Sequence, residues 1–196
     1  MAGRLGSSVG ILYLCRMIAL ERITPAGSGL WGSVERLYSE AFPPEERRAV
    51  ERMRALADSG RLQVEAVVRE GEFCGFITWW DLGGFVFGEH FAVLPECRGG
   101  GIGGRVIDVF TAMAGGRTVV IEVELPTGEL ERRRIGFYRR HGFEVVDFPY
   151  EQPPYEAGYD GVPMHIMTHG AGLSAQEFER VRKRIYEEVY GVDKEF

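Results

Sequence analysis

The feature that most constrains this chain is a glycine-rich joint between an apolar run and an amphipathic one, within Gly88–Phe110. A strand-like run ends at Val93, glycine fills five of the six positions from 99 to 104, and apolar residues then recur at helical spacing. The first backbone N–H groups of a helix lack intrahelical partners and lie at the positive end of its macrodipole. Because glycine has no Cβ, an anion can approach such a main chain closely. The sequence therefore predicts a strand, loop and helix that bind a phosphate group.

One interpretation of this stretch is a dinucleotide-binding loop. Gly99 to Gly104 matches G-x-G-x-x-G, and Glu122 and Glu124 lie near the ~20-residue distance at which that fingerprint places a ribose-binding acid. A strand of that fold runs straight into its first glycine, however, whereas five residues separate Val93 from Gly99. The stretch also lies in mid-chain, after hairpin-like strands. A nucleotide-dependent oxidoreductase is therefore the weaker alternative.

The other interpretation reads R-x-x-G-x-G from Arg98 to Gly103, preceded by F-A-V. In this form the stretch resembles the acyl-CoA-binding motif of the GNAT superfamily of N-acyltransferases. The resemblance implies that backbone N–H groups hold the CoA pyrophosphate and that the preceding strand pairs with the pantetheine arm. It implies acetyl-CoA as the co-substrate. We expect no metal, because neither the histidines nor the cysteines show metal-ligand spacing. The residues assigned to the cofactor in this way are Phe91, Ala92, Val93, Arg98, Gly99, Gly100, Gly101, Ile102, Gly103 and Gly104.

Composition limits the other possibilities. At 196 residues and 45% hydrophobic content, the chain fits one globular domain with an adequate core. Its net charge of -6 disfavours a nucleic-acid or anionic-membrane partner and favours a cationic substrate. Cys15, Cys74 and Cys97 have neither metal-ligand nor redox spacing, which fits a reducing cytoplasm. The four histidines show no metal-ligand pattern either. We leave open whether the protein is a monomer or a homodimer.

Three segments are expected along the chain. Residues 1–16 faintly resemble a signal peptide but lack its cleavage site, so we interpret them as a disordered extension or a start artefact. Residues 17–170 would form the catalytic domain. Residues 171–196 would form a C-terminal amphipathic helix packed on that domain, because a capping box at Ser174 precedes one apolar stripe. A dimer contact is the alternative use of that stripe.

The order of the expected elements indicates a mixed sheet. Hairpin-like strands come first, and a strand, helix, strand crossover follows the glycine loop, which implies a parallel pair. This order agrees with the GNAT-like α/β (α+β) fold that the resemblance implies, a central mixed sheet of about seven strands with helices on both faces. The expected helices are 30–42, 44–57, 102–114, 127–141 and from 174, and the expected strands are 17–23, 62–68, 73–80, 85–93, 118–124, from 143, and 161–167.

Acylation of an amine by a thioester needs a base and an acid. An alkyl amine has a pKa of ~10 and must lose a proton before it attacks, while the leaving thiolate has a pKa of ~8.5 and benefits from a proton donor. Glu122 and Glu89 are the candidate bases, and each has an ion pair as its alternative role. Strand alternation would place Glu89 on the same face as Phe91 and Val93. The sequence leaves open which glutamate is the base.

The candidate acid is Tyr138. The segment R-R-I-G-F-Y-R-R-H-G-F resembles the GNAT helix and turn in which a tyrosine stands beside the CoA sulfur. I-E-V with F-Y-x-x-x-G-F is also similar to the layout of ribosomal-protein alanine acetyltransferases. The resemblance therefore implies an acid role for Tyr138, and packing on the sheet is its alternative.

Acidic and tyrosine-rich segments are expected on the acceptor side. P-P-E-E-R-R stands where GNAT enzymes place a substrate-wall loop, and the segment from Tyr150 to Asp160 contains acids but no Lys or Arg. Together with A-F-P-P-E-E-R-R, the motifs Q-P-P-Y and P-M-H-I-M resemble a bacterial GNAT subgroup over roughly residues 17 to 190. We expect a small-molecule or peptide amine as acceptor, although a catalytically silent acyl-CoA-binding protein is a further alternative. The residues assigned to the acceptor are Glu45, Glu46, Tyr150 and Tyr155.

Overall fold

The computed structural model describes residues 18–192, so the expectation for residues 1–16 lies outside the described residues. An eight-stranded sheet runs through the molecule in the order β1-β2-β3-β4-β5-β8-β6, with β7 paired to β8. The strands are β1 Ile18–Ile23, β2 Leu62–Arg69, β3 Glu72–Asp81, β4 Phe85–Val93, β5 Thr118–Glu124, β6 Phe143–Val145, β7 Tyr150–Gln152 and β8 Val162–His169. The helices are α2 Trp31–Ala41, α3 Val50–Asp58, α4 Ile102–Met113, α5 Glu129–Arg140 and α6 Ala175–Ile185, with short 3-10 turns at Pro44–Glu46 and Pro95–Cys97.

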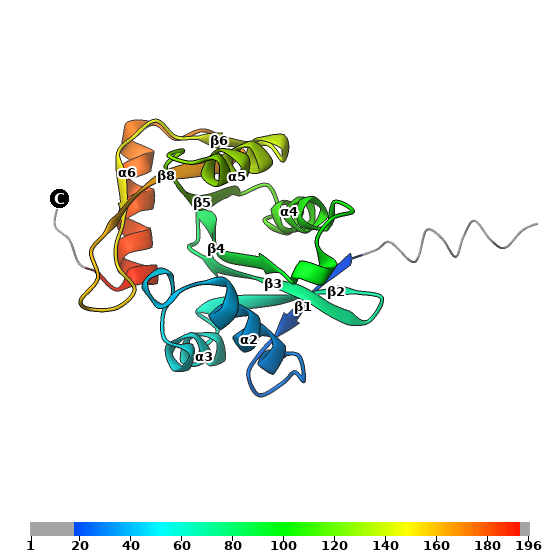
Figure 1. The fold of residues 1–196 in the computed structure, drawn as a ribbon. Helices are drawn as coiled ribbons and strands as arrows, with labels where there is room; N and C mark the ends of the chain where they lie inside the picture. The colour runs from blue at the N-terminus through cyan, green and yellow to red at the C-terminus, as the bar shows by residue number, and fades with distance from the viewer. Residues whose placement is uncertain (1–17, 193–196) are drawn as a thin grey trace, which may run out of the picture.

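Helices cover both faces of the sheet, as predicted (Figure 1). Phe87 and Val120 pack into one cluster with buried side chains of α2, α3 and α6. Val86 and Ile121, one position away along each strand, pack into a second cluster with α4 and α5. The alternation of strand side chains therefore divides the core into two layers. Within residues 18–192, no helix combines the length and the apolar character that crossing a membrane requires.

The sheet is antiparallel from β1 to β4, parallel between β4 and β5, and antiparallel again between β5 and β8. This confirms the mixed sheet. The parallel pairing of β4 with β5 extends only from Phe85 opposite Thr118 to Gly88 opposite Ile121. Beyond that point β4 stays with β3, and β5 stays with β8. The two central strands therefore part just before Glu89 and Glu122.

A β-bulge in β4 changes the direction of Glu89. Thr78 pairs with His90 and Trp79 pairs with Gly88, so Glu89 is the extra residue. The carboxylate of Glu89 bonds to Trp80 in the α2, α3 and α6 layer, and His90 packs on aromatic rings of the same layer. Phe91, by contrast, packs on the α4 side. The expectation that Glu89 shares a face with Phe91 is therefore wrong, because the bulge adds one residue to the alternation.

The helix expected over residues 44–57 is interrupted. A 3-10 turn ends at Glu46, Arg47 is extended with φ -148° and ψ 159°, and α3 begins only at Val50. The break lets the backbone N–H of Arg48 donate to the Tyr38 hydroxyl at 3.1 Å and directs the Arg48 side chain inward, where the residue is 2% exposed. The prediction of a continuous helix was therefore wrong. The apolar periodicity of the segment gives no sign that the chain breaks to bury the Arg48 side chain.

The C-terminal helix closes one layer of the core. The Ser174 hydroxyl accepts from the Glu177 N–H, and the Glu177 carboxylate accepts from the Ser174 N–H, so the predicted capping box is present. Phe178, Val181 and Ile185 lie buried in the layer shared with α2 and α3. The helix continues as a π-helical turn, Tyr186–Tyr190. This turn and β7 were not predicted.

Candidate active site

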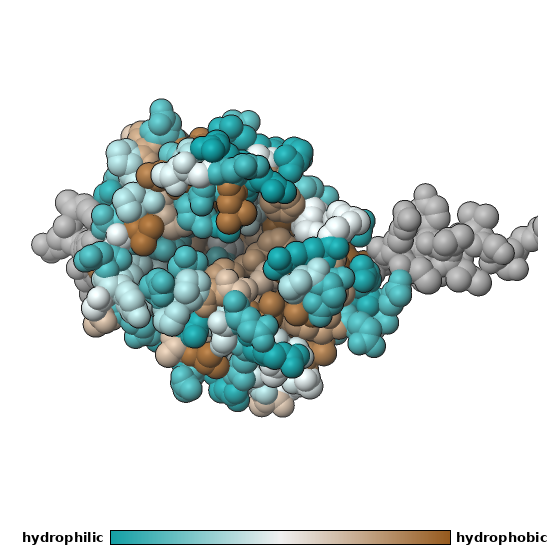
Figure 2. Space-filling model, in the orientation of Figure 1, coloured by the Kyte–Doolittle hydropathy of each residue, from teal (hydrophilic) through white to brown (hydrophobic). Residues whose placement is uncertain are grey.

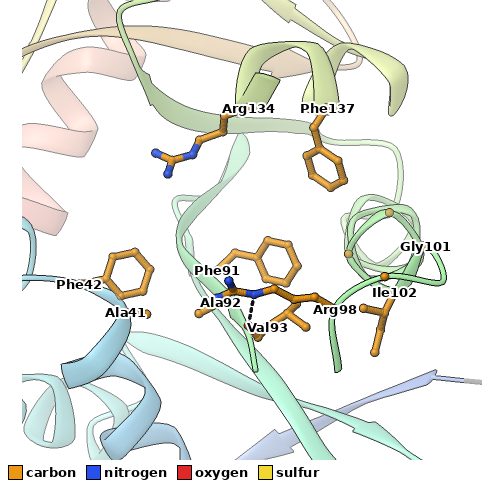
Figure 3. A pocket seen from close by; sticks show the side chains of 13 residues that line it. Ala41, Phe42, Phe91, Ala92, Val93, Arg98, Gly101, Ile102, Arg134 and Phe137 are labelled. Atoms are coloured by element: carbon orange, nitrogen blue, oxygen red, sulfur yellow. Dashed lines mark hydrogen bonds between the residues drawn. The ribbon is translucent and has the colours of Figure 1, made fainter. Parts of the chain in front are cut away.

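A groove of about 510 Å³ runs between the end of β4, the loop before α4, and α5. Figure 3 shows Arg134 and Phe137 projecting from α5, with Phe42, Phe91 and Arg98 on the opposite side. The space-filling view shows apolar side chains gathered in this hollow below the hydrophilic surface of α5 (Figure 2). Nine of the ten residues assigned to the cofactor line it, and Gly100 is in the same loop. The lining residues are Ala41, Phe42, Phe91, Ala92, Val93, Arg98, Gly99, Gly101, Ile102, Gly103, Gly104, Arg134 and Phe137.

The backbone of the glycine loop suits an anion. Gly99, Gly100 and Gly101 have φ values of 85°, 57° and 74°, three successive left-handed residues that a chain of L-amino acids adopts readily only with glycine. Among the described residues, no side chain caps the first turn of α4. The Arg98 Nε donates to the Val93 carbonyl at 3.0 Å and so joins the loop to the end of β4 (Figure 3). Unpartnered N–H groups on such a loop form an anion-binding concavity.

The loop also leaves space for a ligand beside α4, because a Cβ at Gly99 or Gly100 would meet nothing within 4 Å in the part of the chain that the structure describes. A Cβ at Gly103 would contact the rings of Phe137 and Phe91, at 3.6 to 3.9 Å. Gly103 has ordinary helical geometry and lines the groove. The residues present therefore fit a diphosphate with a long apolar arm.

The three catalytic candidates meet behind the groove. Glu89, Glu122 and Tyr138 line a small cavity of about 30 Å³ between the parted strands, and Phe91 lines both this cavity and the groove. Tyr138 packs its ring against Phe137 and Phe143, with centroids 5.2 and 5.5 Å apart. Burial raises the pKa of Tyr138 to about 12, although the Arg134 charge lowers it. The phenol is therefore protonated at neutral pH.

Glu122 is surrounded by neutral donors. Its carboxylate accepts hydrogen bonds from the Tyr190 hydroxyl at 2.7 Å, from the Gln152 amide at 2.6 Å and from the Tyr150 hydroxyl. Burial raises the pKa of Glu122, these three donors lower it, and the negative charge of Glu89 raises it further. Burial outweighs the donors, so the pKa of Glu122 lies above its usual value.

Glu89 is held by a cation instead. Arg48 Nη1 lies 2.6 Å from Glu89 Oε1, and the two side chains are 2% and 1% exposed. Trp80 and Tyr155 also donate to the Glu89 carboxylate, at 3.0 and 3.3 Å. Burial opposes the charged form, but the Arg48 guanidinium, together with His90 and the Trp80 N–H, prevails and lowers the pKa of Glu89 to about 2. Glu89 is therefore an ionised partner of Arg48.

Hydroxyl groups connect the two carboxylates. The Tyr190 oxygen lies 3.4 Å from the Tyr155 oxygen, and these two tyrosines contact Glu122 and Glu89 respectively. Tyr150 and Tyr155, assigned to the acceptor from sequence, are buried at 6% and 8% exposure and face the carboxylates. Their substrate role stays a prediction.

The other two residues assigned to the acceptor adjoin the cavity through His90, which lines it. Glu45 and Glu46 form part of the exposed 3-10 turn, and the Glu46 carbonyl lies 3.1 Å from His90 Nε2. Burial and the charge of Glu124 raise the pKa of Glu46, and Glu124 itself pairs with Arg134 of α5. Acids from two distant segments therefore face one another at this edge. Among the described residues, no group of three or more His, Cys, Asp or Glu side chains is placed to hold a metal ion.

Comparisons with known proteins assign the family. The chain is 38% identical to a GNAT-family protein from Bacteroides thetaiotaomicron, with a TM-score of 0.84 over 89% of this chain and 99% of that one. The family model described as "Acetyltransferase (GNAT) domain" matches residues 63–145. This chain belongs to the GNAT family of acetyltransferases. The comparison with curated proteins finds no match.

More distant GNAT structures share the fold. The ribosomal-protein-S18-alanine N-acetyltransferase from Escherichia coli is 17% identical, with a TM-score of 0.57 over 82% of this chain and 97% of that one. A GNAT family acetyltransferase from Elizabethkingia anophelis with acetyl-CoA bound is 16% identical, with a TM-score of 0.54 over 79% of this chain and 98% of that one. The GNAT fold thus binds acetyl-CoA, and GNAT acetyltransferases act on amine acceptors. The oxidoreductase alternative is wrong, because the glycine loop belongs to this fold.

Sequence reasoning missed three residues of this GNAT site. Arg48, Gln152 and Tyr190 had no assigned role, although the motifs A-F-P-P-E-E-R-R and Q-P-P-Y contain the first two. In these motifs only Glu45, Glu46 and Tyr155 were assigned, to the acceptor. For Tyr190 the sequence offers no comparable signal, since it follows the apolar stripe of a surface helix.

Proposed function

We propose that this GNAT enzyme transfers an acetyl group from acetyl-CoA to a primary amine of a small molecule or peptide by direct attack. The observation that carries this proposal is the convergence of Glu122 and Tyr138 on one cavity at the inner end of the glycine-lined groove. The groove would hold the CoA pyrophosphate at the start of α4 and the pantetheine arm along the end of β4. The thioester would then reach the parted strands.

Glu122 is the proposed base. Its pKa is raised toward the working range of a base, whereas Glu89 has a pKa of about 2 and therefore a low proton affinity. A carboxylate has roughly four acceptor positions, and the three donors to Glu122 fill three of them. The fourth is available to the substrate ammonium. We therefore assign proton removal to Glu122 and a structural role to Glu89.

Tyr138 is the proposed donor to the departing sulfur. The ammonium loses one proton to Glu122 before attack and a second as the C–N bond forms. The C–S bond then breaks, and this second proton ends on the departing sulfur, while Glu122 holds the first. Full transfer from a phenol of pKa about 12 to a thiolate of pKa ~8.5 would cost roughly 5 kcal/mol. Tyr138 would therefore stabilise the thiolate by a hydrogen bond rather than by losing its proton completely.

The acceptor is proposed to be cationic. The charges of Glu45 and Glu124 both act on Glu46, and the segment from Tyr150 to Asp160 carries acids without Lys or Arg. An acidic surface beside the site raises the local concentration of cationic amines. Arg134 neutralises part of this charge, which leaves a site for one ammonium group rather than a strongly acidic channel.

The free thiols of Cys74 and Cys97 fit an enzyme of the reducing cytoplasm.

Two measurements test this function. Mass spectrometry of the purified protein should find bound CoA or acetyl-CoA. A panel of amines assayed by thiol release at low salt should favour polyamines, aminoglycosides or basic peptides over anionic amino acids. Faster turnover of anionic amino acids would contradict the acceptor class. Bound acetyl-CoA with no thiol release from any amine would instead indicate the catalytically silent alternative.

A further inference from the structure

The end of the C-terminal helix reaches the proposed base. Tyr190, the last residue of the π-helical turn, is 7% exposed, and its hydroxyl lies 2.7 Å from Glu122 Oε2. π-Helical turns place side chains off the regular helical spacing and often occur at functional sites. The turn closes at Gly191, where φ is 68° and the Val192 N–H donates to the Tyr186 carbonyl at 2.9 Å. The position of Tyr190 is thus defined by the backbone.

We propose that Tyr190 is a positioning residue for the base Glu122 and that Arg48 holds Tyr190 in place, so that the C-terminal helix completes the active site. This inference rests on the proposed function. It gives a role to two sequence motifs, A-F-P-P-E-E-R-R and Q-P-P-Y, that the chemistry alone does not require.

Each hydrogen-bond donor around Glu122 has an acceptor. The Gln152 amide lies 2.6 Å from the Glu122 carboxylate and 2.9 Å from the Tyr190 oxygen, so its two N–H bonds serve both. The single hydrogen of Tyr190 then points to Glu122, and the hydrogen of Tyr155 points to Glu89. These three hydrogen bonds are strongest while Glu122 is ionised. A proton that binds Glu122 takes its fourth acceptor position and weakens the three bonds, because a neutral carboxyl group is a poorer acceptor than a carboxylate.

Arg48 connects this arrangement to the bulge in β4. Its Nη2 donates to the carbonyl of Val189, the residue before Tyr190, at 3.2 Å, while its Nη1 pairs with Glu89. Its guanidinium also lies 4.7 Å from the centre of the Tyr155 ring. One buried arginine therefore fixes the C-terminal turn, the Tyr155 loop and the Glu89 carboxylate relative to one another. Lysine, a single point charge, lacks this planar fork.

Several ionisable groups face Glu122 and belong to any pH dependence. Tyr150 lies on β7, and Tyr155 lies in the loop that follows β7. Tyr190 belongs to the π-helical turn, and Glu89 belongs to β4. Tyr138 of α5 lines the same cavity, Tyr186 of the π-helical turn feels the charge of Glu122, and Arg48 and His90 contact Glu89. Among these, Tyr190 acts on Glu122 by donating a hydrogen bond to its charged form. Removing that bond favours the protonated form.

The test is the pH profile of kcat/KM for Tyr190→Phe, with Tyr186→Phe as the matched control. The acid limb of Tyr190→Phe should move to higher pH by about one unit, because a hydrogen bond to a charged acceptor is lost while the ring remains. The Tyr186 hydroxyl donates to the main-chain carbonyl of Glu151 and its ring packs on Tyr150, which phenylalanine preserves, so the control should move the midpoint less than Tyr190→Phe does. A Tyr190→Phe profile that coincides with wild type would overturn the proposal, even if the melting temperature falls.

A second variant tests the proposal if the Tyr190→Phe protein does not fold. Arg48→Lys keeps a cation near Glu89 but cannot also serve the Val189 carbonyl, so its acid limb should move in the same direction by a smaller amount. An unchanged limb in folded Arg48→Lys would overturn the proposal. Failure of the proposed function looks different, because the wild type itself would then release no thiol with any amine.

Discussion

Glu89 and Glu122 lie on neighbouring strands at the same opening, yet their surroundings differ. A guanidinium pairs with Glu89 and keeps its pKa at about 2, whereas hydroxyl and amide groups surround Glu122, whose pKa is raised. A full positive charge offsets the loss of solvation, and neutral dipoles do so only in part. Burial alone therefore does not make a carboxylate a base. The groups that bond to each carboxylate decide which of the two can take a proton.

The largest expected effect is on catalysis by Glu122. Glu122→Gln should lower kcat by about 10³-fold, which corresponds to roughly 4 kcal/mol of lost barrier reduction, because an amide cannot accept the amine proton. Steady-state kinetics with a verified acceptor would measure this, and the KM for acetyl-CoA should change little. If Glu122→Gln retained a tenth of the wild-type kcat, the contrast between the two glutamates would lose its basis.

The next effect is on stability and belongs to Glu89. Its folded pKa of about 2 lies below its ordinary value of 4.5, so its ion pair contributes stability above pH 4.5 that is lost as the pH falls toward 2. The loss of unfolding free energy should be about 3 kcal/mol over that window, because proton binding is then weaker in the folded protein than in the unfolded chain. Denaturant unfolding at several pH values should show this loss in the wild type and a flatter dependence in Glu89→Gln. That variant should also be less stable at pH 7, because Arg48 is left unpaired.

Glu124→Gln is the matched control for that experiment. Glu124 pairs with Arg134 at the surface, where the two side chains are 35% and 42% exposed. Exposed pairs contribute little, so the pH dependence of stability should follow the wild type within about 1 kcal/mol. An equal loss of stability in both variants at pH 7 would remove the distinction between the buried and exposed pairs.

A smaller catalytic effect is expected at Tyr138. Tyr138→Phe should lower kcat by about 10²-fold, or roughly 3 kcal/mol, with little change in the KM for acetyl-CoA, because its hydroxyl contact forms mainly in the transition state. A packing role predicts a loss of stability instead, since phenylalanine keeps the ring. A folded variant with more than half of wild-type kcat, while chemistry limits the rate, would exclude the donor role.

The smallest expected effect concerns the glycine loop. Gly103→Leu should weaken acetyl-CoA binding by about tenfold, because the new side chain enters the groove from a helical position without backbone strain. Gly101→Val is a poorer test, since φ at Gly101 is 74° and strain would confuse the result. Gly32→Leu, in α2 with open space at its Cβ, is the control. Calorimetry should show unchanged affinity in the control, and equal affinity in Gly103→Leu would contradict the assigned cofactor site.

Local features of the site were predictable from the sequence. The glycine loop would bind the cofactor through its own backbone, so the sequence signal lies in the consecutive residues Gly99 to Gly104 at the start of α4. The strand that holds Glu122 was predicted with the same bounds, 118–124, because continuous β-branched residues mark a buried strand. The structure places Tyr138, assigned from its resemblance to a GNAT helix, in the cavity with Glu122, and its acid role stays a prediction.

The contacts that separate the two glutamates were not predictable. Arg48 pairs with Glu89 across 41 residues of chain, after a break in a helix that the periodicity presents as continuous. Gln152 lies on a three-residue strand among prolines, too short to show alternation. The bulge at Glu89 adds a residue that no pattern reveals. Long-range partners, rather than local propensity, decide these pKa values.

The pH dependence of kcat/KM in Glu89→Gln tests the assignment of the base most directly. The negative charge of Glu89 raises the pKa of Glu122, so its removal should leave an active enzyme whose acid limb lies at lower pH than in the wild type. Loss of both the activity and the acid limb in a folded Glu89→Gln protein would show that Glu89, and not Glu122, removes the proton.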